Sequence, residues 1–265
     1  MRLHRGPAGS ITTPAELDLW RLASDPDPDV HAVSSTLATI PELATATVRF
    51  ANSAYVGTAY PVGTVLQAVV RVGCRTVASL AAAASGRSIM SSFGDEDMWT
   101  RALVVSRGAK TIGRLAGLGH EAAEQAFVAG LFVDFGSTIL SKRDASYRSW
   151  RSSMVKSRTK PETLLERERD LYGADHAMLS GQLLEEWNFP PVISTAVAMH
   201  HGPINDLERV LKASLSVLPD DDHIESCVDV GLDKALAELD LTEHAEFVRR
   251  EAALFADNAA AAFVR

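Results

Sequence analysis

The chain has 265 residues, a formal net charge of −8 and 46% hydrophobic residues. This length allows one large domain or two moderate ones with a sizeable core, and the negative charge argues against general binding to nucleic-acid backbones. No secretory signal and no apolar run long enough to cross a bilayer are visible. Cys74 and Cys227 show no metal-ligand spacing and fit a reducing compartment. We therefore expect a cytoplasmic protein without a membrane or nucleic-acid partner.

The first third of the chain reads as a series of short helices. Residues 1–12 carry charged, Gly and Pro residues and are expected to form a disordered leader, after which Thr13 caps the first helix. Asp29 is expected to cap the second helix, which ends near Ile40. The polar segment 91–97 is the predicted boundary between an N-terminal helical lobe and the rest of the chain. The helices expected between these points are 41–51, 65–72 and 75–89, and the two lobes are 13–92 and 93–265.

The remainder of the chain also has the apolar spacing of helices. Phe127, Gly130, Leu131 and Asp134 follow one another at i, i+3, i+4 and i+7, so Asp134 should point where the buried side chains point. There is no alternation of period two that would demand a strand, and there is no internal repeat. The predicted fold class is all-α. Its helices are expected at 98–116, 121–133, 136–156, 161–172, 176–187, 191–201, 205–218, 232–239 and 242–263.

Charge is distributed unevenly along the second half of the chain. Basic residues outnumber acidic ones from 142 to 169, and acidic residues dominate from 219 to 246. Charge runs of this kind usually form solvated helical surfaces. The alternative is an anion-binding face on the basic segment. Its candidate residues are Arg148, Arg151, Lys156, Arg158 and Lys160.

Three segments carry a resemblance to a known family. They are Ile40–Ala54 with Ala68–Gly73 after it, Trp99–Gly136, and Tyr172–His176 with Leu183–Trp187, Pro190 and His200-His201 after it. In their order and spacing the chain resembles the HDOD family, bacterial regulatory domains related to HD phosphohydrolases. The resemblance covers about residues 14–215. It implies an N-terminal helical lobe and an HD-like helical bundle, followed here by C-terminal helices.

The related enzymes hydrolyse phosphoester bonds, including those of cyclic dinucleotides, with bound metal ions. Carried over one by one, their first histidine ligand falls on Arg101 and their second on Val133. The aspartate of the pair is retained as Asp134, whereas a final aspartate expected near Ala213-Ser214 is absent. A valine has no lone pair for a metal and an arginine repels one. The resemblance therefore implies a vestigial pocket without catalysis.

Three histidines complicate this interpretation. His176, His200 and His201 match the extra histidines of the multi-metal relatives, and together with Asp134 they could hold one metal. The preferred interpretation is structural. His176 would form local hydrogen bonds at a helix start beside Asp175, and His200-His201 would cap a helix end as cations. We therefore expect no bound metal and no cofactor.

The retained carboxylate needs a partner of its own. A buried carboxylate left without one costs on the order of 3–5 kcal/mol. Arg101 could stand where the metal charge stood and pair with Asp134. The alternative is an exposed Arg101 and an Asp134 that accepts hydrogen bonds from backbone amides. The sequence leaves both open.

Asn52-Ser53 is a second distinctive pair. These side chains could contact a ligand or partner between the two lobes. Asn is also a common helix terminator and turn former, and this structural role is the preferred one.

The sequence thus predicts a non-catalytic regulatory protein, a pseudoenzyme in signal transduction that acts through contacts with protein partners. One alternative is a regulator that binds a nucleotide such as a cyclic dinucleotide in the ancestral pocket. A second alternative is a residual metal-dependent phosphohydrolase.

Overall fold

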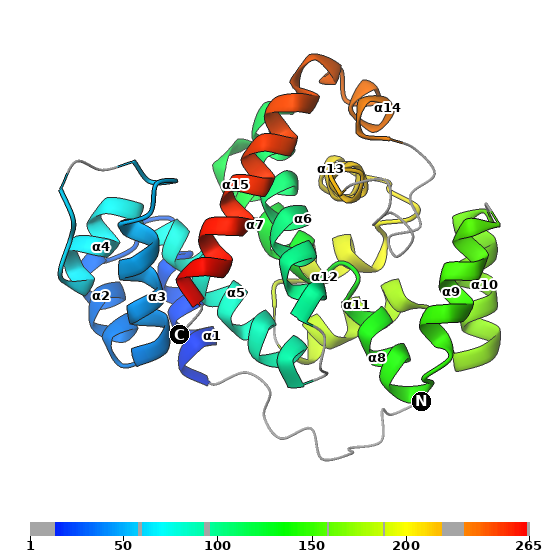
Figure 1. The fold of residues 1–265 in the computed structure, drawn as a ribbon, viewed down its shortest axis with the longest axis horizontal. Coiled ribbons are helices and arrows are strands. Elements are labelled where there is room, and N and C mark those ends of the chain that lie inside the picture. The colour runs from blue at the N-terminus through cyan, green and yellow to red at the C-terminus, as the bar shows by residue number, and fades with distance from the viewer. Residues whose placement is uncertain are drawn as a thin grey trace. The chain divides into compact units, whose positions relative to one another are not determined.

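The structure is a computed structural model, which describes residues 14–57, 60–92, 96–157, 159–187, 189–218 and 231–263. Every regular element in these ranges is a helix, which confirms the predicted all-α fold class (Figure 1). The chain separates into two compact units. Unit 1 comprises residues 1–96 and 258–265, and unit 2 comprises residues 97–257. The predicted leader, residues 1–12, and the predicted cap Thr13 lie outside the described residues.

Unit 1 contains helices α1–α5, and local signals set their ends. The Asp29 carboxylate accepts hydrogen bonds from the backbone amides of His31 and Ala32, as predicted for the second helix. The Thr64 hydroxyl accepts one from the amide of Gln67. Helix α1 packs on α5, and α4 packs on α2 and α3. The bounds are α1 Pro14–Ala23, α2 Val30–Ala38, α3 Pro41–Ala51, α4 Val65–Val72 and α5 Cys74–Ser92.

Unit 2 holds most of the remaining helices. Its interior is built on long apolar side chains, among which Phe127, Phe132, Phe135 and Leu103 are fully buried. Helix α11 packs against α8 and α12, and α7 packs against α12 and α13 (Figure 1). The bounds are α6 Glu96–Leu115, α7 Gly119–Phe132, α8 Phe135–Arg143, α9 Tyr147–Lys156, α10 Pro161–Tyr172, α11 His176–Glu186, α12 Pro191–Ala198, α13 Asp206–Leu215, α14 Leu232–Ala237 and α15 Ala245–Phe263.

The single helix predicted over 136–156 is wrong, because the chain breaks between α8 and α9. Asp144 has an extended backbone, and its carboxylate accepts hydrogen bonds from the amide and hydroxyl of Ser146 at 2.8 and 2.7 Å. It also accepts one from the Tyr172 hydroxyl at 3.0 Å. Short polar side chains compete with the helix in this way by bonding nearby backbone. The break lets α9 return toward the start of α8, where Arg151 bonds Ser137.

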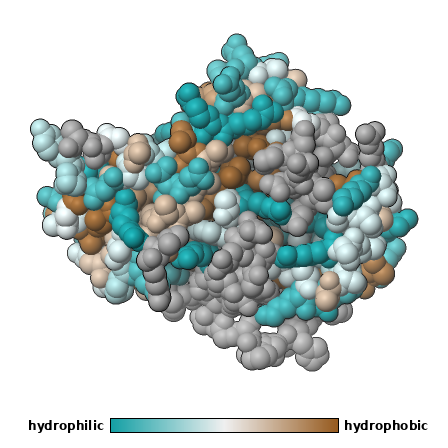
Figure 2. Space-filling view, in the orientation of Figure 1, coloured by the Kyte–Doolittle hydropathy of each residue, from teal (hydrophilic) through white to brown (hydrophobic). Residues whose placement is uncertain are grey.

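Hydrophilic and hydrophobic residues alternate over the face drawn in Figure 2. Figure 2 shows hydrophilic residues spread over this face, with smaller hydrophobic areas between them. Tyr60, Val70, Leu171 and Ile204 are exposed and come from different elements. Scattered apolar residues of this kind are normal on folded proteins. In the described ranges no helix alone combines the length and apolar character of a bilayer span; α4 and the start of α5 do so only as a pair bent by 106°.

Candidate functional site

The site begins at the turn Val133-Asp134, which joins α7 to α8. The flanking Phe132 and Phe135 anchor this turn in the core, where both rings contact Trp187, at centroid distances of 5.8 and 6.0 Å. The Val133 side chain is buried. It thus contributes apolar packing at the position where the related enzymes have a histidine ligand.

Gly136 lets the turn lie directly against the start of α11. A Cβ atom at position 136 would lie 2.0 Å from the backbone oxygen of His176. The Gly136 amide donates a hydrogen bond of 2.7 Å to the Ser180 hydroxyl, which in turn donates to the His176 carbonyl. This close backbone approach, which only glycine permits, places Asp134 beside the His176 ring.

The partner of Asp134 is Arg151 of α9. The Arg151 guanidinium donates a hydrogen bond to Asp134 Oδ1 at 3.3 Å and one to the Ser137 hydroxyl at 2.7 Å. Of the two possibilities that the sequence left open, neither names this partner: one paired Asp134 with Arg101, and the other bonded it to backbone amides. Arg101 lies half-buried on α6 and is not among the residues that bond Asp134. An arginine does neutralise the retained carboxylate, but it comes from a helix later in the chain.

His176 is oriented by a carboxylate that the sequence analysis did not single out. Glu168 of α10 is fully buried and accepts hydrogen bonds from Nδ1 and the backbone amide of His176, at 2.7 and 2.9 Å, and from the Tyr147 hydroxyl at 2.6 Å. Burial acts to raise the pKa of Glu168, but the His176 ring and the Arg151 guanidinium outweigh it and lower this pKa to about 2. Glu168 is therefore a carboxylate.

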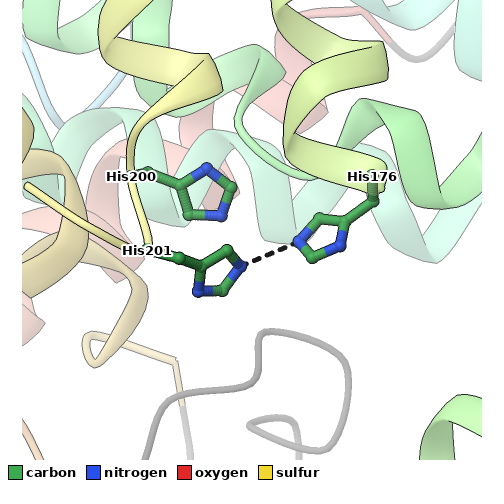
Figure 3. Close-up of side chains that lie close together, drawn as sticks. All are labelled: His176, His200 and His201. Carbon is green, nitrogen blue, oxygen red and sulfur yellow. Dashed lines mark hydrogen bonds between the residues drawn. The ribbon is translucent and has the colours of Figure 1, made fainter. Parts of the chain in front are cut away.

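The other two histidines follow the end of α12 and face His176 (Figure 3). His176 Nε2 lies 2.9 Å from His201 Nε2, and the rings of His200 and His201 are 4.0 Å apart. Burial, together with the nearby imidazoles, lowers the pKa of His200 to about 4 and that of His201 well below its ordinary value. Both rings are neutral at pH 7. His200 does cap the end of α12, because its Nδ1 donates to the Val197 carbonyl at 2.7 Å. The predicted cationic form is wrong for this ring, because burial lowers its pKa to about 4.

The residues present do not fit the metal centre of the related hydrolases. Val133 offers no ligand, and the Arg151 guanidinium occupies the side of Asp134 that a cation would need. The three histidines are different, because their rings lie close together. One ring nitrogen from each of His176, His200 and His201 lies within 4.8 Å of the other two, and no fourth side chain of the described residues joins this group. The alternative metal site considered from the sequence consisted of Asp134 and three histidines. In the structure the three histidines lie together and Asp134 is not part of their group.

The remaining predicted residues do not join this site. Arg151 is buried, so it does not belong to a solvated anion-binding face with Arg148, Lys156 and Lys160, which are exposed. Arg158 lies outside the described residues.

In unit 1, Asn52 accepts a hydrogen bond from the amide of Val62 and donates one to its carbonyl, at 2.8 and 2.9 Å. Ser53, the other half of this predicted contact, is partly buried. Both ends of the Asn52 amide thus close the loop after α3, in agreement with its predicted structural role.

Glu168 could have been found from the sequence. It lies four residues after Leu164, and both side chains are on the buried face of α10. A charged residue at helical spacing from a core leucine signals a buried carboxylate that needs partners. The same argument would not have identified Arg151, because its burial depends on the unforeseen break between α8 and α9.

Comparison with known proteins identifies the fold. The HDOD domain family matches residues 14–203. The structure is similar to that of a "Putative phosphohydrolase" from Shewanella amazonensis SB2B, with a TM-score of 0.70, 21% identity, and coverage of 94% of each chain. It is also similar to an HDOD domain protein with unknown function from Geobacter sulfurreducens, with a TM-score of 0.63, 18% identity, and coverage of 91% of each chain.

A third similar structure is larger. It is described as a "Putative signal transduction protein" from Marinobacter aquaeolei VT8, with a TM-score of 0.71 and 19% identity. The match covers 94% of this chain and 59% of that one. No curated protein matches the chain. The segment matched by the HDOD family spans most of the sequence and includes both the Asp134 turn and the three histidines, so the chain belongs to the HDOD domain family.

Proposed function

We propose that this chain is a non-catalytic regulatory protein that transmits a signal through contacts with other proteins. The observation that carries the proposal is the Arg151–Asp134 ion pair, with Arg151 Nη2 also 3.5 Å from His176 Nε2. A fixed positive charge therefore lies among the groups that a hydrolytic metal would need.

Metal-assisted phosphoester hydrolysis requires a cation that activates water and offsets phosphate charge. Magnesium and manganese are held chiefly by oxygen ligands, and Asp134 is the carboxylate retained at this turn. Its bond to Arg151 removes that ligand and adds repulsion toward a second cation. A likeness in fold to a protein named as a phosphohydrolase does not restore these ligands, because unrelated activities share folds.

The proposal is tested by phosphodiesterase assays of the purified protein with bis(p-nitrophenyl) phosphate and with cyclic dinucleotides, each with added Mn²⁺ or Fe²⁺. We expect no metal-dependent turnover, and the same background rate for the wild type and for Asp134→Asn. Turnover that needs Mn²⁺ and disappears in Asp134→Asn would overturn the proposal and favour the residual phosphohydrolase.

The partner contacts need a separate experiment. The chain is crosslinked in the native cell, and the proteins captured by the wild type are compared with those captured by Arg101→Ala and Asp134→Ala. We expect the wild type to capture a protein partner, whose binding to the purified chain can then be measured. Calorimetric titration with cyclic dinucleotides tests the alternative regulator. A saturable binding heat for the wild type that disappears in Arg151→Met would show that the chain binds the nucleotide. This result would favour a nucleotide, and not a protein contact, as the signal that the chain receives.

A further inference from the structure

We infer that His176, His200 and His201 form a binding site for a single borderline transition-metal ion of the zinc class, which links the start of α11 to the segment after α12. The inference goes beyond the proposed function and does not depend on it. It rests on which nitrogen of each ring carries a proton, on a buried nitrogen without a partner, and on the chemistry of the donor set.

The hydrogen bonds of two rings determine their tautomers. His176 Nδ1 donates to the Glu168 carboxylate at 2.7 Å, and the Arg151 guanidinium, which can only donate, lies 3.5 Å from His176 Nε2. These contacts make Nε2 the acceptor nitrogen of this ring. His200 Nδ1 donates to the Val197 carbonyl at 2.7 Å, which also leaves the lone pair on Nε2. A carboxylate or carbonyl that holds the distal N–H is the usual outer shell of a metal-binding histidine. Both rings are thus prepared as ligands through Nε2.

The Nε2 atom of His200 is the strongest single observation. It is buried and has no hydrogen-bond partner among the described residues. A buried polar atom left unsatisfied costs about 1–3 kcal/mol, so such atoms call for an explanation. A metal ion bound to this nitrogen would supply the missing interaction.

The third ligand is His201, the only one of the three that is partly exposed. Its Nε2 lies 2.9 Å from His176 Nε2, so in the metal-free protein His201 must donate the proton there. Metal binding would move this proton from Nε2 to Nδ1, which changes the tautomer without changing the charge of the ring. The exposed edge of His201 offers an entry path for the ion.

The spacing fits a metal after a small adjustment. The three ligand atoms lie within 4.8 Å of one another, whereas zinc–nitrogen bonds of about 2.0–2.1 Å place tetrahedral ligands roughly 3.3 Å apart. The largest separation thus exceeds the tetrahedral distance by up to about 1.5 Å, and small rotations of the rings would close this difference. Three imidazoles without a carboxylate suit Zn²⁺, Ni²⁺ or Cu²⁺ and disfavour Mg²⁺ and Mn²⁺.

Arg151 sharpens this selectivity. Its bond to Asp134 keeps that carboxylate, whose Oδ1 is 3.5 Å from His176 Nε2, out of the ligand set. Glu168 and Asp134 nonetheless supply two negative charges close to the site, against the single positive charge of Arg151. Arg151 Nη2 also lies 3.5 Å from His176 Nε2, so its charge opposes a cation at this ring, and the two carboxylates offset that charge. All side-chain ligands of the ion would then be ring nitrogens.

The test is equilibrium dialysis and thermal denaturation of the full chain with Zn²⁺, compared with Mn²⁺ and Mg²⁺. We expect one Zn²⁺ per chain, a higher Tm with Zn²⁺ alone, and at least a tenfold loss of Zn²⁺ affinity in His200→Gln and in His201→Gln. The matched control is His31→Gln, which alters an exposed histidine of α2 and should leave the affinity unchanged. Circular dichroism confirms that each variant is folded.

Co²⁺ gives a readout that does not depend on stability. Bound by three imidazoles, it should show visible ligand-field bands that shift or vanish in His200→Gln and persist in His31→Gln. Equal Zn²⁺ affinity in the wild type and His200→Gln, or Mn²⁺ binding as tight as that of Zn²⁺, would overturn the inference. Phosphodiester turnover by the Zn²⁺-loaded protein would leave this site intact and overturn the proposed function instead.

Discussion

The Asp134 turn and the histidine cluster are neighbours in unit 2, but they have diverged in different ways. At the turn, Val133 packs in the core and the Asp134 carboxylate is neutralised by Arg151. In the cluster, burial lowers the pKa of His200 and His201, and acceptors on Nδ1 orient the rings of His176 and His200. The comparison teaches that packing pairs the carboxylate at the turn with a cation, whereas it gathers one ring nitrogen from each of three histidines within 4.8 Å of one another.

The close approach of the two halves is the first target. Gly136→Ala would place a Cβ 2.0 Å from the His176 carbonyl oxygen, so α8 and α11 must separate. The neighbouring atoms belong to the backbone and can give way only if the helices move apart. We therefore expect the free energy of unfolding, measured with urea, to fall by more than about 3 kcal/mol. Gly202→Ala is the control, because nothing lies within 4 Å of its added Cβ. Equal stability of both variants would show that the turn does not need glycine.

The next largest effect should come from the cation at the turn. Arg151→Met leaves the mostly buried Asp134 without its ion pair, and we expect a loss of about 3 kcal/mol in unfolding free energy. Adding Asp134→Asn should recover part of this loss in a double-mutant cycle. Arg148→Met, an exposed position on the same helix, should change stability by less than about 0.5 kcal/mol. Additive losses in the cycle would contradict the pairing.

The cluster half should respond to acid through Glu168. The pKa of Glu168 is about 2 in the folded protein and 4.5 ordinarily, so its stabilisation is complete above pH 4.5 and declines as the pH falls toward 2. The full contribution to the free energy of unfolding is roughly 3 kcal/mol. The difference in unfolding free energy between the wild type and Glu168→Gln, measured by urea denaturation at several pH values, should decrease as the pH falls through this range. A constant difference between pH 6 and pH 3 would argue against an ionised Glu168.

The smallest effect should come from restoring the lost ligand type. Val133→His places a polar ring at a buried position and should cost about 1–2 kcal/mol of unfolding free energy. It should not create Mn²⁺ binding, because Arg151 still holds Asp134. Mn²⁺ binding is measured by equilibrium dialysis for Val133→His and for the double variant Val133→His/Arg151→Met. The comparison separates the effect of the absent histidine from the effect of the Arg151 charge. Mn²⁺ binding by the single variant would show that the missing histidine alone had disabled the turn.

Sequence patterns predicted the helical architecture because apolar spacing and capping residues act locally. Asp29 caps α2 as expected, Thr64 caps α4, and Asn52 closes its loop through its own amide. The one long helix predicted over 136–156 failed at Asp144, where a side chain bonds nearby backbone groups and a distant tyrosine. Propensity alone could not weigh that competition.

The sequence by itself determined which ligand types remain: Val133 in place of a histidine, a retained Asp134, and three further histidines. Only the tertiary structure decided which cation meets Asp134 and which nitrogens of the histidines keep their lone pairs. Those outcomes depend on Arg151 and Glu168, which reach the site from α9 and α10. Partner choice between distant segments is a property of packing, because burial makes each buried charge or N–H take a partner that the fold brings near.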